Sequence, residues 1–351
     1  MTHSYTQTAS NKADISQLVW HQQFASALNA TLTSTLRGAL WGAIAVTIWG
    51  VYLAVARANV SGGILPADVA FVRYTVAGLL MLPWLLRHSP STMAGLGWSK
   101  ALMLTALAGP LFILVSASGF QFAPLAHGAV VQPAAITVAG LLLGAVLLRD
   151  SLTQTRVIGA GVILAGLAFI AGPSALIGGL SSLAGDALFA SAGVMWALFS
   201  VLSRRWSISP IAATAAVSVL SAVIYLPVYL FTHGINTLAA LPIHAIAQLI
   251  IVHGILSGVV AVYAFGRAVE MLGAARAAAF PAMVPVVATL VGIPLTGEIP
   301  GYLQIAGLVV VTLGLAITQR SPKPDEKAAS SCRIIISKPQ PQATVRAHGN
   351  L

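Results

Sequence analysis

The polar side chains that interrupt long apolar runs are the residues that could do chemistry in this chain. Arg73 lies seven residues after Pro66 in one such run, which places its charge about 10 Å along a helix. A charge at that depth in a lipid bilayer is costly unless it reaches the interface, pairs with a carboxylate or faces a wet cavity. Asp68 and Asp186 are the candidate partners. A cavity-facing guanidinium would instead clamp an anion or a carboxylate.

Aromatic residues recur at helical spacing near the middle of two apolar runs. Trp49 and Tyr52 are three residues apart, and Trp196 and Ser200 are four apart, so each pair shares a helix face. Such faces could line a pocket near the middle of the bilayer. Packing or anchoring at the interface is the alternative that the spacing leaves open.

Three further polar groups lie within apolar runs. His253 could relay a proton, because a neutral imidazole both donates and accepts; a hydrogen-bonded structural histidine is the alternative. Gln132 precedes Pro133, and Tyr263 lies ten residues after His253. The candidate cavity residues are therefore Trp49, Tyr52, Arg73, Gln132, Trp196, Ser200, His253 and Tyr263.

Two acidic residues, Asp150 and Glu298, each lie in a short polar corner between apolar runs. A carboxylate just before a helix can cap free N–H groups, and this structural role is favoured over a proton or gating role. No spacing typical of a cysteine or histidine metal site occurs, and no GxxxxGK phosphate loop occurs. The sequence therefore predicts no catalytic residues, no metal and no cofactor.

The elements that carry these residues are predicted to be membrane helices. Of the 351 residues, 58% are hydrophobic and 7% are charged, whereas soluble domains carry about 25% charged residues. The predicted fold is an all-α polytopic membrane protein with ten transmembrane helices. Their ranges are 37–57, 66–87, 100–121, 125–147, 153–171, 181–203, 209–231, 245–267, 273–296 and 299–319.

The chain contains one five-helix unit twice. Residues 123–170 match residues 271–318 at a shift of 148, so that the acidic corners correspond and several prolines and glycines coincide. The matched pairs are Pro133 and Pro281, Gly144 and Gly292, Asp150 and Glu298, Gly159 and Gly307, and Gly166 and Gly314. Trp49 matches Trp196, and Arg57 matches Arg204, at a shift of 147. Because five is odd, the second copy must enter the membrane inverted.

This duplication predicts four parts of the chain. They are a cytoplasmic N-terminal tail at 1–36, a first repeat at 37–171, a second repeat at 181–319 and a basic cytoplasmic tail at 320–351. With both ends in the cytoplasm, 16 of the 18 Lys and Arg residues fall on the cytoplasmic side, with Arg57 and Arg73 as the exceptions. We therefore expect an integral protein of the cytoplasmic (inner) membrane.

The charge pattern also bears on partners. The net charge is +10, but the basic residues are spread as topology signals, and the basic tail lacks aromatic residues for base stacking. The expected partners are a small-molecule metabolite and the lipid bilayer, and not nucleic acid. The oligomeric state is left open.

Several of these motifs together resemble EamA-type transporters of the drug/metabolite transporter superfamily. The run 298–304 (EIPGYLQ), followed by Gly307 and Gly314, resembles the family's closing helix pair, as does the first copy with Asp150, Gly159 and Gly166. The likeness extends to Trp49, the run 72–74 (VRY), the pair Gly185 and Asp186, and the pair Trp196 and Ala197. It covers about residues 37–319.

Two departures accompany the resemblance. Asp150 stands where the family more usually has Glu, and in the second repeat Ala275 and Phe280 replace His127 and Gln132.

The resemblance implies a secondary transporter, and not an enzyme, that exports or imports a small polar metabolite by alternating access, and it does not fix the direction. We expect an exporter. The alternatives are a polytopic membrane enzyme that acts on a lipid and a channel-like membrane protein.

Overall fold

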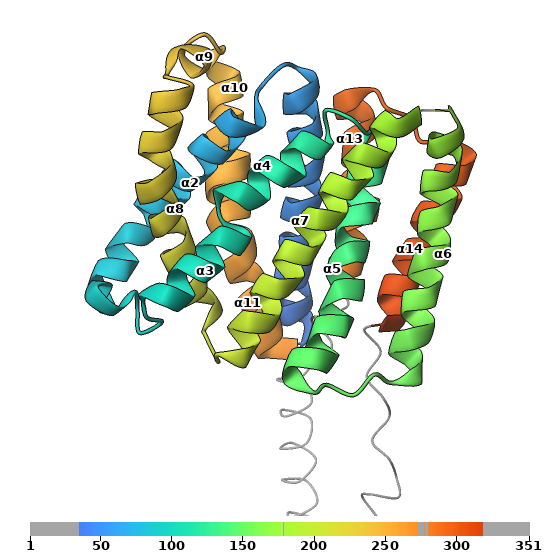
Figure 1. Cartoon of the computed structure of the whole chain (residues 1–351), viewed down its shortest axis with the longest axis horizontal. Coiled ribbons are helices and arrows are strands. Elements are labelled where there is room, and N and C mark those ends of the chain that lie inside the picture. The colour runs from blue at the N-terminus through green and yellow to red at the C-terminus, as the bar shows by residue number, and fades with distance from the viewer. Residues whose placement is uncertain (1–34, 178, 273–276, 278–279, 319–351) are drawn as a thin grey trace, which may run out of the picture.

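A computed structural model describes residues 35–177, 179–272, 277 and 280–318 (Figure 1). Helices are the regular secondary structure of this described part, which contains no strand. The predicted tails lie outside it apart from residues 35–36, and so does the start of the predicted segment 273–296.

The first repeat folds into a series of apolar helices joined by short connections. Their bounds are the first helix Thr35–Ser61, α2 Pro66–Arg87, a 3-10 turn Pro90–Thr92, α3 Trp98–Ala108, α4 Pro110–Gly119, α5 Leu125–Leu148 and α6 Gln154–Ile177. The predicted segment 100–121 is thus broken into α3 and α4. The break falls at Gly109–Pro110, where Pro110 lacks the N–H that would continue the hydrogen-bond pattern of α3 and instead begins α4.

The second repeat follows the same order with an extra pair of short elements and a π-helical segment. Its elements are α7 Gly179–Arg205, α8 Pro210–Thr232, α9 Asn236–Ala239, α10 Ile243–Gln248, the π-helical segment Leu249–Val260, α11 Ala261–Leu272, a 3-10 turn Phe280–Met283, α13 Val284–Thr296 and α14 Tyr302–Thr318.

Seven helical spans of the described part are long and apolar enough to cross a membrane, with α3 and α4 counted together as Trp98–Gly119 and the elements from Ile243 to Leu272 counted as one. Three shorter apolar stretches, Gln154–Ile170 within α6, Phe280–Thr296 and Tyr302–Thr318, occupy the positions of the fifth, ninth and tenth predicted segments. The chain is therefore an integral membrane protein. The count of ten crossings stays a prediction.

The two acidic corners lie at opposite ends of the bundle. Glu298 Oε2 accepts a hydrogen bond from the backbone N–H of Leu125, the first residue of α5. Asp150 follows the other end of α5, which has 24 residues and is therefore about 36 Å long. Figure 1 accordingly shows the α5–α6 connection at the lower end and the α13–α14 connection at the upper end. This is the arrangement that inverted copies produce.

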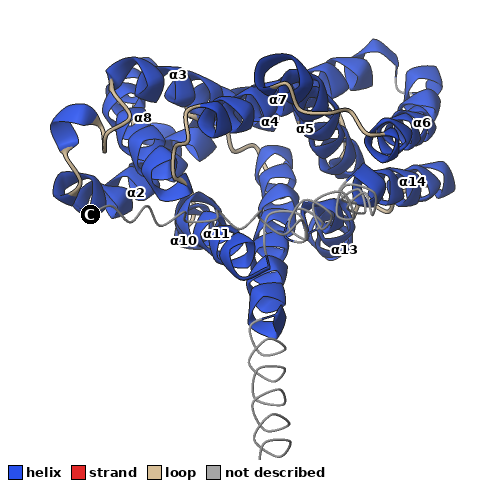
Figure 2. Ribbon diagram, turned by 90° about the horizontal axis from the view of Figure 1, so that it is seen from below, coloured by secondary structure: helices blue, strands red, loops and turns tan. Residues whose placement is uncertain are grey.

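Helices of one repeat pack along helices of the other. The first repeat's α2, α5 and α6 lie along α8, α7 and α14 of the second. Figure 2 shows α2 beside α8 at one edge of the bundle and α6 beside α14 at the other. The two repeats therefore share one core and do not form separate domains.

Four glycines bring α6 and α14 into backbone contact. A Cβ atom added to Gly159 would lie 3.0 Å from the carbonyl oxygen of Gly314, and one added to Gly166 would lie 3.0 Å from that of Gly307. The reciprocal distances are 3.0 Å from Gly314 to Gly159 and 2.8 Å from Gly307 to Gly166. The 148-residue shift relates Gly159 to Gly307 and Gly166 to Gly314, so the duplication exchanges the Gly159–Gly314 contact with the Gly166–Gly307 contact. Small residues permit this close approach of membrane helices.

Candidate functional site

A cavity of about 240 Å³ lies between the two repeats. Both copies contribute to its wall, which is mostly apolar and aromatic. The lining residues are Trp49, Tyr52, Leu53, Arg73, Phe112, Gln132, Pro133, Ile136, Thr137, Trp196, Ser257, Phe265, Pro281, Ala282, Val284 and Leu315. Pockets for drug-sized ligands span roughly 300–1,000 Å³, so this cavity fits a small molecule.

Two tryptophans that the duplication relates lie on the cavity wall. The Trp49 ring lies 5.4 Å from the ring of Phe265, and the Trp196 ring lies 5.1 Å from that of Phe112. In both cases the first helix of one repeat contacts the third helical region of the other. Pro133 and Pro281, also related by the duplication, line the same cavity. The wall is therefore nearly symmetric in its apolar part.

Arg73 breaks that symmetry. Its Nη1 donates a hydrogen bond of 2.7 Å to Ser257 Oγ, and the guanidinium carbon lies 5.3 Å from the centre of the Tyr52 ring. The residue is only 9% exposed, and its Nε is buried without a hydrogen-bond partner. Pro66 and Pro83 of α2 match Pro210 and Pro227 of α8 at a shift of 144 residues, and the same shift makes Val217 the counterpart of Arg73. The positive charge therefore belongs to one side of the cavity.

The two carboxylates that the sequence offered as partners for Arg73 are engaged elsewhere. Asp68 accepts hydrogen bonds from the Tyr229 hydroxyl at 2.5 Å and from the Leu65 N–H at 3.2 Å. Asp186 lies 2.8 Å from Nδ1 of His127. The predicted pairing of Arg73 with either one is wrong. An arginine at the centre of a membrane helix costs about 2.5–3.5 kcal/mol on insertion scales, and the hydrogen bond to Ser257 and the faces of the Tyr52 and Tyr74 rings reduce that cost.

Of the other predicted cavity residues, Gln132 lines the cavity and His253 lies next to Tyr52 on its wall, whereas Ser200 and Tyr263 do not line it. Gln132 lines the cavity, and its Oε1 accepts a hydrogen bond of 2.8 Å from Ser116 Oγ. His253 is fully buried behind Tyr52, with its ring 5.1 Å from that ring and its Nε2 3.3 Å from Asn59 Nδ2.

Ser200 and Tyr263 lie outside the cavity. Ser200 is exposed and donates to the carbonyl of Trp196, one turn back, and Tyr263 is 55% exposed and packs on Trp41. Ser200 lies one helical turn from Trp196, as the spacing predicted, but its hydroxyl donates to the carbonyl of that turn and does not line the cavity.

Sequence reasoning missed several lining residues, above all Ser257, Phe112 and Phe265. Ser257 lies four residues after His253 in the π-helical segment, and that shared face was the available signal. Phe112 and Phe265 are not related by the repeat shift, so the duplication could not point to them. π-helical turns are frequent at functional sites.

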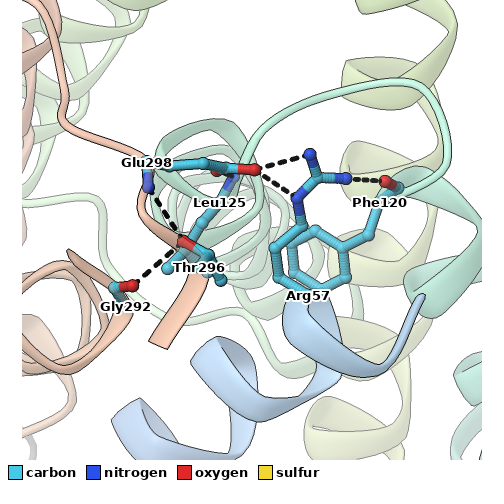
Figure 3. Close-up of polar contacts among 6 residues, drawn as sticks. All are labelled: Arg57, Phe120, Leu125, Gly292, Thr296 and Glu298. Carbon is cyan, nitrogen blue, oxygen red and sulfur yellow. Dashed lines mark hydrogen bonds and ion pairs between the residues drawn. The ribbon is translucent and has the colours of Figure 1, made fainter. Parts of the chain in front are cut away.

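An ion pair joins the repeats at one end of the bundle (Figure 3). Arg57 Nη2 lies 2.5 Å from Glu298 Oε1, and Nε donates to the same oxygen at 2.6 Å. Arg57 Nη1 also donates to the carbonyl of Phe120, while Glu298 accepts from the Leu125 N–H at 2.8 Å. The first helix, the α4–α5 connection and the α13–α14 connection are thereby tied together.

The duplicated counterpart of this ion pair occurs at the other end. Arg204 Nη2 donates to both oxygens of Asp150, at 2.8 and 2.6 Å. The side chains of this pair are 62% and 31% exposed, whereas those of Arg57 and Glu298 are 20% and 28% exposed. The sequence predicted that each acid caps the helix that follows it. Instead each pairs with an arginine of the other repeat, and the N–H group that Glu298 accepts from belongs to α5.

Comparison with known proteins identifies the chain. The model of the EamA-like transporter family matches residues 36–172 and again residues 183–320. The chain belongs to the EamA-like transporter family. Its EamA repeats include both ion pairs and every residue that lines the cavity.

The EamA chain is also similar to a curated bacterial protein. It is 27% identical over 197 residues to a protein of Bacillus subtilis (strain 168) described as "Uncharacterized transporter YyaM". The match covers 54% of this chain and 64% of that protein, so it spans just under two thirds of the relative.

A crystal structure provides a fold comparison for the EamA chain. The match has a TM-score of 0.53 at 19% identity and covers 80% of this chain and 96% of the other. At that identity the likeness concerns the fold alone. Family and relative together indicate a transporter and not an enzyme.

Proposed function

We propose that this EamA protein is a secondary transporter that exports a small polar metabolite across the cytoplasmic membrane by alternating access. The observation that carries the proposal is the cavity between the repeats, whose wall includes the duplicated residues Trp49 and Trp196 and the duplicated residues Pro133 and Pro281. A site formed at the interface of inverted repeats is reached from either face when the repeats rock against each other.

The two ion pairs support alternating access. Arg57–Glu298 and Arg204–Asp150 are equivalent under the duplication, join the two repeats and lie at opposite ends of the bundle. We propose that each closes one face, so that breaking one pair opens the cavity to that side while the other pair holds. A conformational change requires such a difference in interactions between its states.

The orientation follows from the positions of the charges. Helix directions place eight of the ten described Lys and Arg residues at the end of the bundle that holds Arg204 and Asp150. They are Arg37, Arg87, Lys100, Arg149, Arg156, Arg204, Arg205 and Arg267. Under the positive-inside rule this end is cytoplasmic, and Arg57 and Glu298 face the outside. Both termini then lie in the cytoplasm, and ten crossings connect them.

Export is the direction we propose, because a metabolite made in the cytoplasm supplies its own outward gradient. Comparative metabolomics of the medium from overexpressing and deletion cells tests this direction. We expect at least one small solute to accumulate outside the overexpressing cells. Unchanged solute levels on both sides under all growth conditions would contradict export.

Flux through the purified protein in proteoliposomes tests the transporter class itself. A carrier gives saturable counterflow of a solute identified from the medium. An ohmic current would indicate a channel, and turnover of a lipid would indicate a membrane enzyme. Either result without counterflow would contradict the proposal.

A further inference from the structure

We infer that the cavity takes a small monoanion, a carboxylate attached to a flat apolar body, and that Arg73 binds the carboxylate. This inference rests on the proposed function, because it assigns a substrate class to the same cavity. It is carried by the lack of a carboxylate partner for Arg73 in the described part, by the unpaired Nε of its guanidinium and by the aromatic residues of the same cavity wall.

Within the described part of the chain, no carboxylate pairs with Arg73. The chain has eight acidic residues, of which Asp14, Asp325 and Glu326 lie outside the described part. Each of the other five has a partner other than Arg73. The pairs are Asp68 with Tyr229, Asp150 with Arg204, Asp186 with His127, Glu270 with Arg267 and Glu298 with Arg57. A bound anion would supply the missing negative charge.

The donors of Arg73 suit a carboxylate. Its side chain lines the cavity, Nη1 is used by Ser257, and Nε is buried with no hydrogen-bond partner in the described part. Parallel N–H groups on one edge of a guanidinium match the two oxygens of a carboxylate. The Ser257 hydroxyl, which accepts from Arg73, keeps its own proton free to donate to the same anion.

The rest of the wall suits a flat apolar body. Trp49, Trp196, Phe112 and Phe265 present aromatic rings, and the volume of about 240 Å³ leaves room for a single ring with a short side chain. One cation on the described wall balances one negative charge. The cavity therefore favours a monoanion over a phosphate dianion, and over a zwitterion or a cation, whose ammonium group would find no carboxylate there.

A monoanion is also consistent with export. The interior of a cell is electrically negative, so the membrane potential drives an anion outward. A carrier that moves such a solute needs no coupled ion to work in that direction.

The test compares ligands that share a phenyl ring and differ in charge. Radiolabelled phenylacetate, phenylalanine, phenethylamine and phenyl phosphate are each measured by equilibrium dialysis against the purified full-length protein. We expect phenylacetate to bind at least tenfold more tightly than each of the other three. Tighter or equal binding of phenethylamine, phenylalanine or phenyl phosphate would overturn the inference, and so would binding of none of the four.

Two variants of α2 test whether Arg73 is the residue that binds the anion. Arg73→Gln removes the charge in the cavity, and Arg87→Gln removes an exposed charge at the end of the same helix. We expect the first to weaken phenylacetate binding at least tenfold and the second to leave it unchanged. If the folded Arg73→Gln protein, checked by size-exclusion chromatography, binds phenylacetate like the unaltered protein, the assignment to Arg73 is wrong. The ligand series on the unaltered protein does not depend on this variant folding.

The outcome for the substrate class is separable from that for the transporter. Failure of phenylacetate to bind, combined with saturable counterflow of another solute, would remove the monoanion and leave the carrier in place. Absence of counterflow for every solute would remove the carrier itself.

Discussion

Three arginines show how differently this chain holds charge in or near the bilayer. Arg57 and Arg204 are duplicated residues with duplicated partners, and each pairs with a carboxylate of the other repeat. Arg73 has no counterpart and faces the cavity. Arg57 and Arg204, which the duplication preserved, therefore join the two repeats. Arg73, which has no charged counterpart in the second repeat, lies in the cavity.

In the proposed orientation Glu298 faces the outside, and neutralising it should open the cavity to that side. A hydrogen bond to a charged group contributes about 1.5–3 kcal/mol, so Glu298→Gln should shift the equilibrium between the two faces roughly tenfold or more. The measurement is the rate at which an impermeant maleimide, added outside, labels Thr137→Cys in a Cys332→Ser background. We expect faster labelling in Glu298→Gln.

Asp150→Asn is the matched variant at the other face. It should slow external labelling, and by no more than a few fold, because exposed pairs contribute about 0–1 kcal/mol and Arg204 is 62% exposed. Arg267→Gln, which breaks an exposed pair with Glu270, is the control without effect. Equal labelling in all four proteins would show that the ion pairs do not close the faces.

The tryptophans of the cavity should matter for transport. Aromatic contacts contribute about 0.5–1.5 kcal/mol each, so Trp49→Ala and Trp196→Ala should each lower counterflow about twofold to tenfold. Trp98→Ala is the control, because Trp98 is 53% exposed and lies outside the cavity. Normal counterflow in both cavity variants, at normal expression, would remove the tryptophans from the substrate site.

At the scale of helices, the contact between α6 and α14 depends on the absence of side chains. A Cβ atom at Gly166 would lie 2.6 Å from Val311 Cγ2 and 2.8 Å from the Val311 backbone nitrogen. A side chain there must push the helices apart, because backbone cannot move aside as a flexible side chain can.

Gly166→Leu should therefore destabilise the protein. Overpacking in a closely packed interface costs about 1–3 kcal/mol, which should lower the apparent Tm in detergent by several degrees. Gly161→Leu is the matched control, since Gly161 lies on the same helix, is exposed and has nothing within 4 Å of its added Cβ. Equal Tm values for the two variants would show that the crossing contributes little.

The sequence predicted helix positions well where proline and charge mark the ends. The segment predicted at 66–87 coincides with α2, and 125–147 differs from α5 by one residue. The break between α3 and α4 was missed, because a Gly–Pro step inside an apolar run is also compatible with a kinked continuous helix. Periodicity does not distinguish the two.

The candidate site was predictable only in part, for a geometric reason. Trp49, Tyr52, Arg73, Gln132 and Trp196 line the cavity, and duplication or an unusual charge in an apolar run pointed to them. The partner of Arg73 could not be foreseen, because Ser257 lies 184 residues away and in a π-helical segment. Which face a helix turns toward a distant neighbour is decided by packing of the whole bundle.

At the scale of the whole molecule, the inverted arrangement makes a prediction about sidedness. Ser61 ends the first helix, and Ser91 follows α2 at the opposite end of the bundle; both are exposed. In intact cells carrying Cys332→Ser, an impermeant maleimide should label Ser61→Cys and not Ser91→Cys. Permeabilised cells, in which both should react, are the control. Labelling of Ser91→Cys alone would place the chain the other way up.

The close contact of Gly159 and Gly166 with Gly307 and Gly314 bears on how the protein avoids leaking water and solutes across the membrane. Because the duplication exchanges the Gly159–Gly314 contact with the Gly166–Gly307 contact, this crossing lies at the axis that relates the halves, and in the proposed alternating access atoms near that axis move least. When the two halves rotate about this crossing, the gap between them widens on one side of the membrane and narrows on the other. A solute could then be passed across without a continuous water path ever joining the two sides.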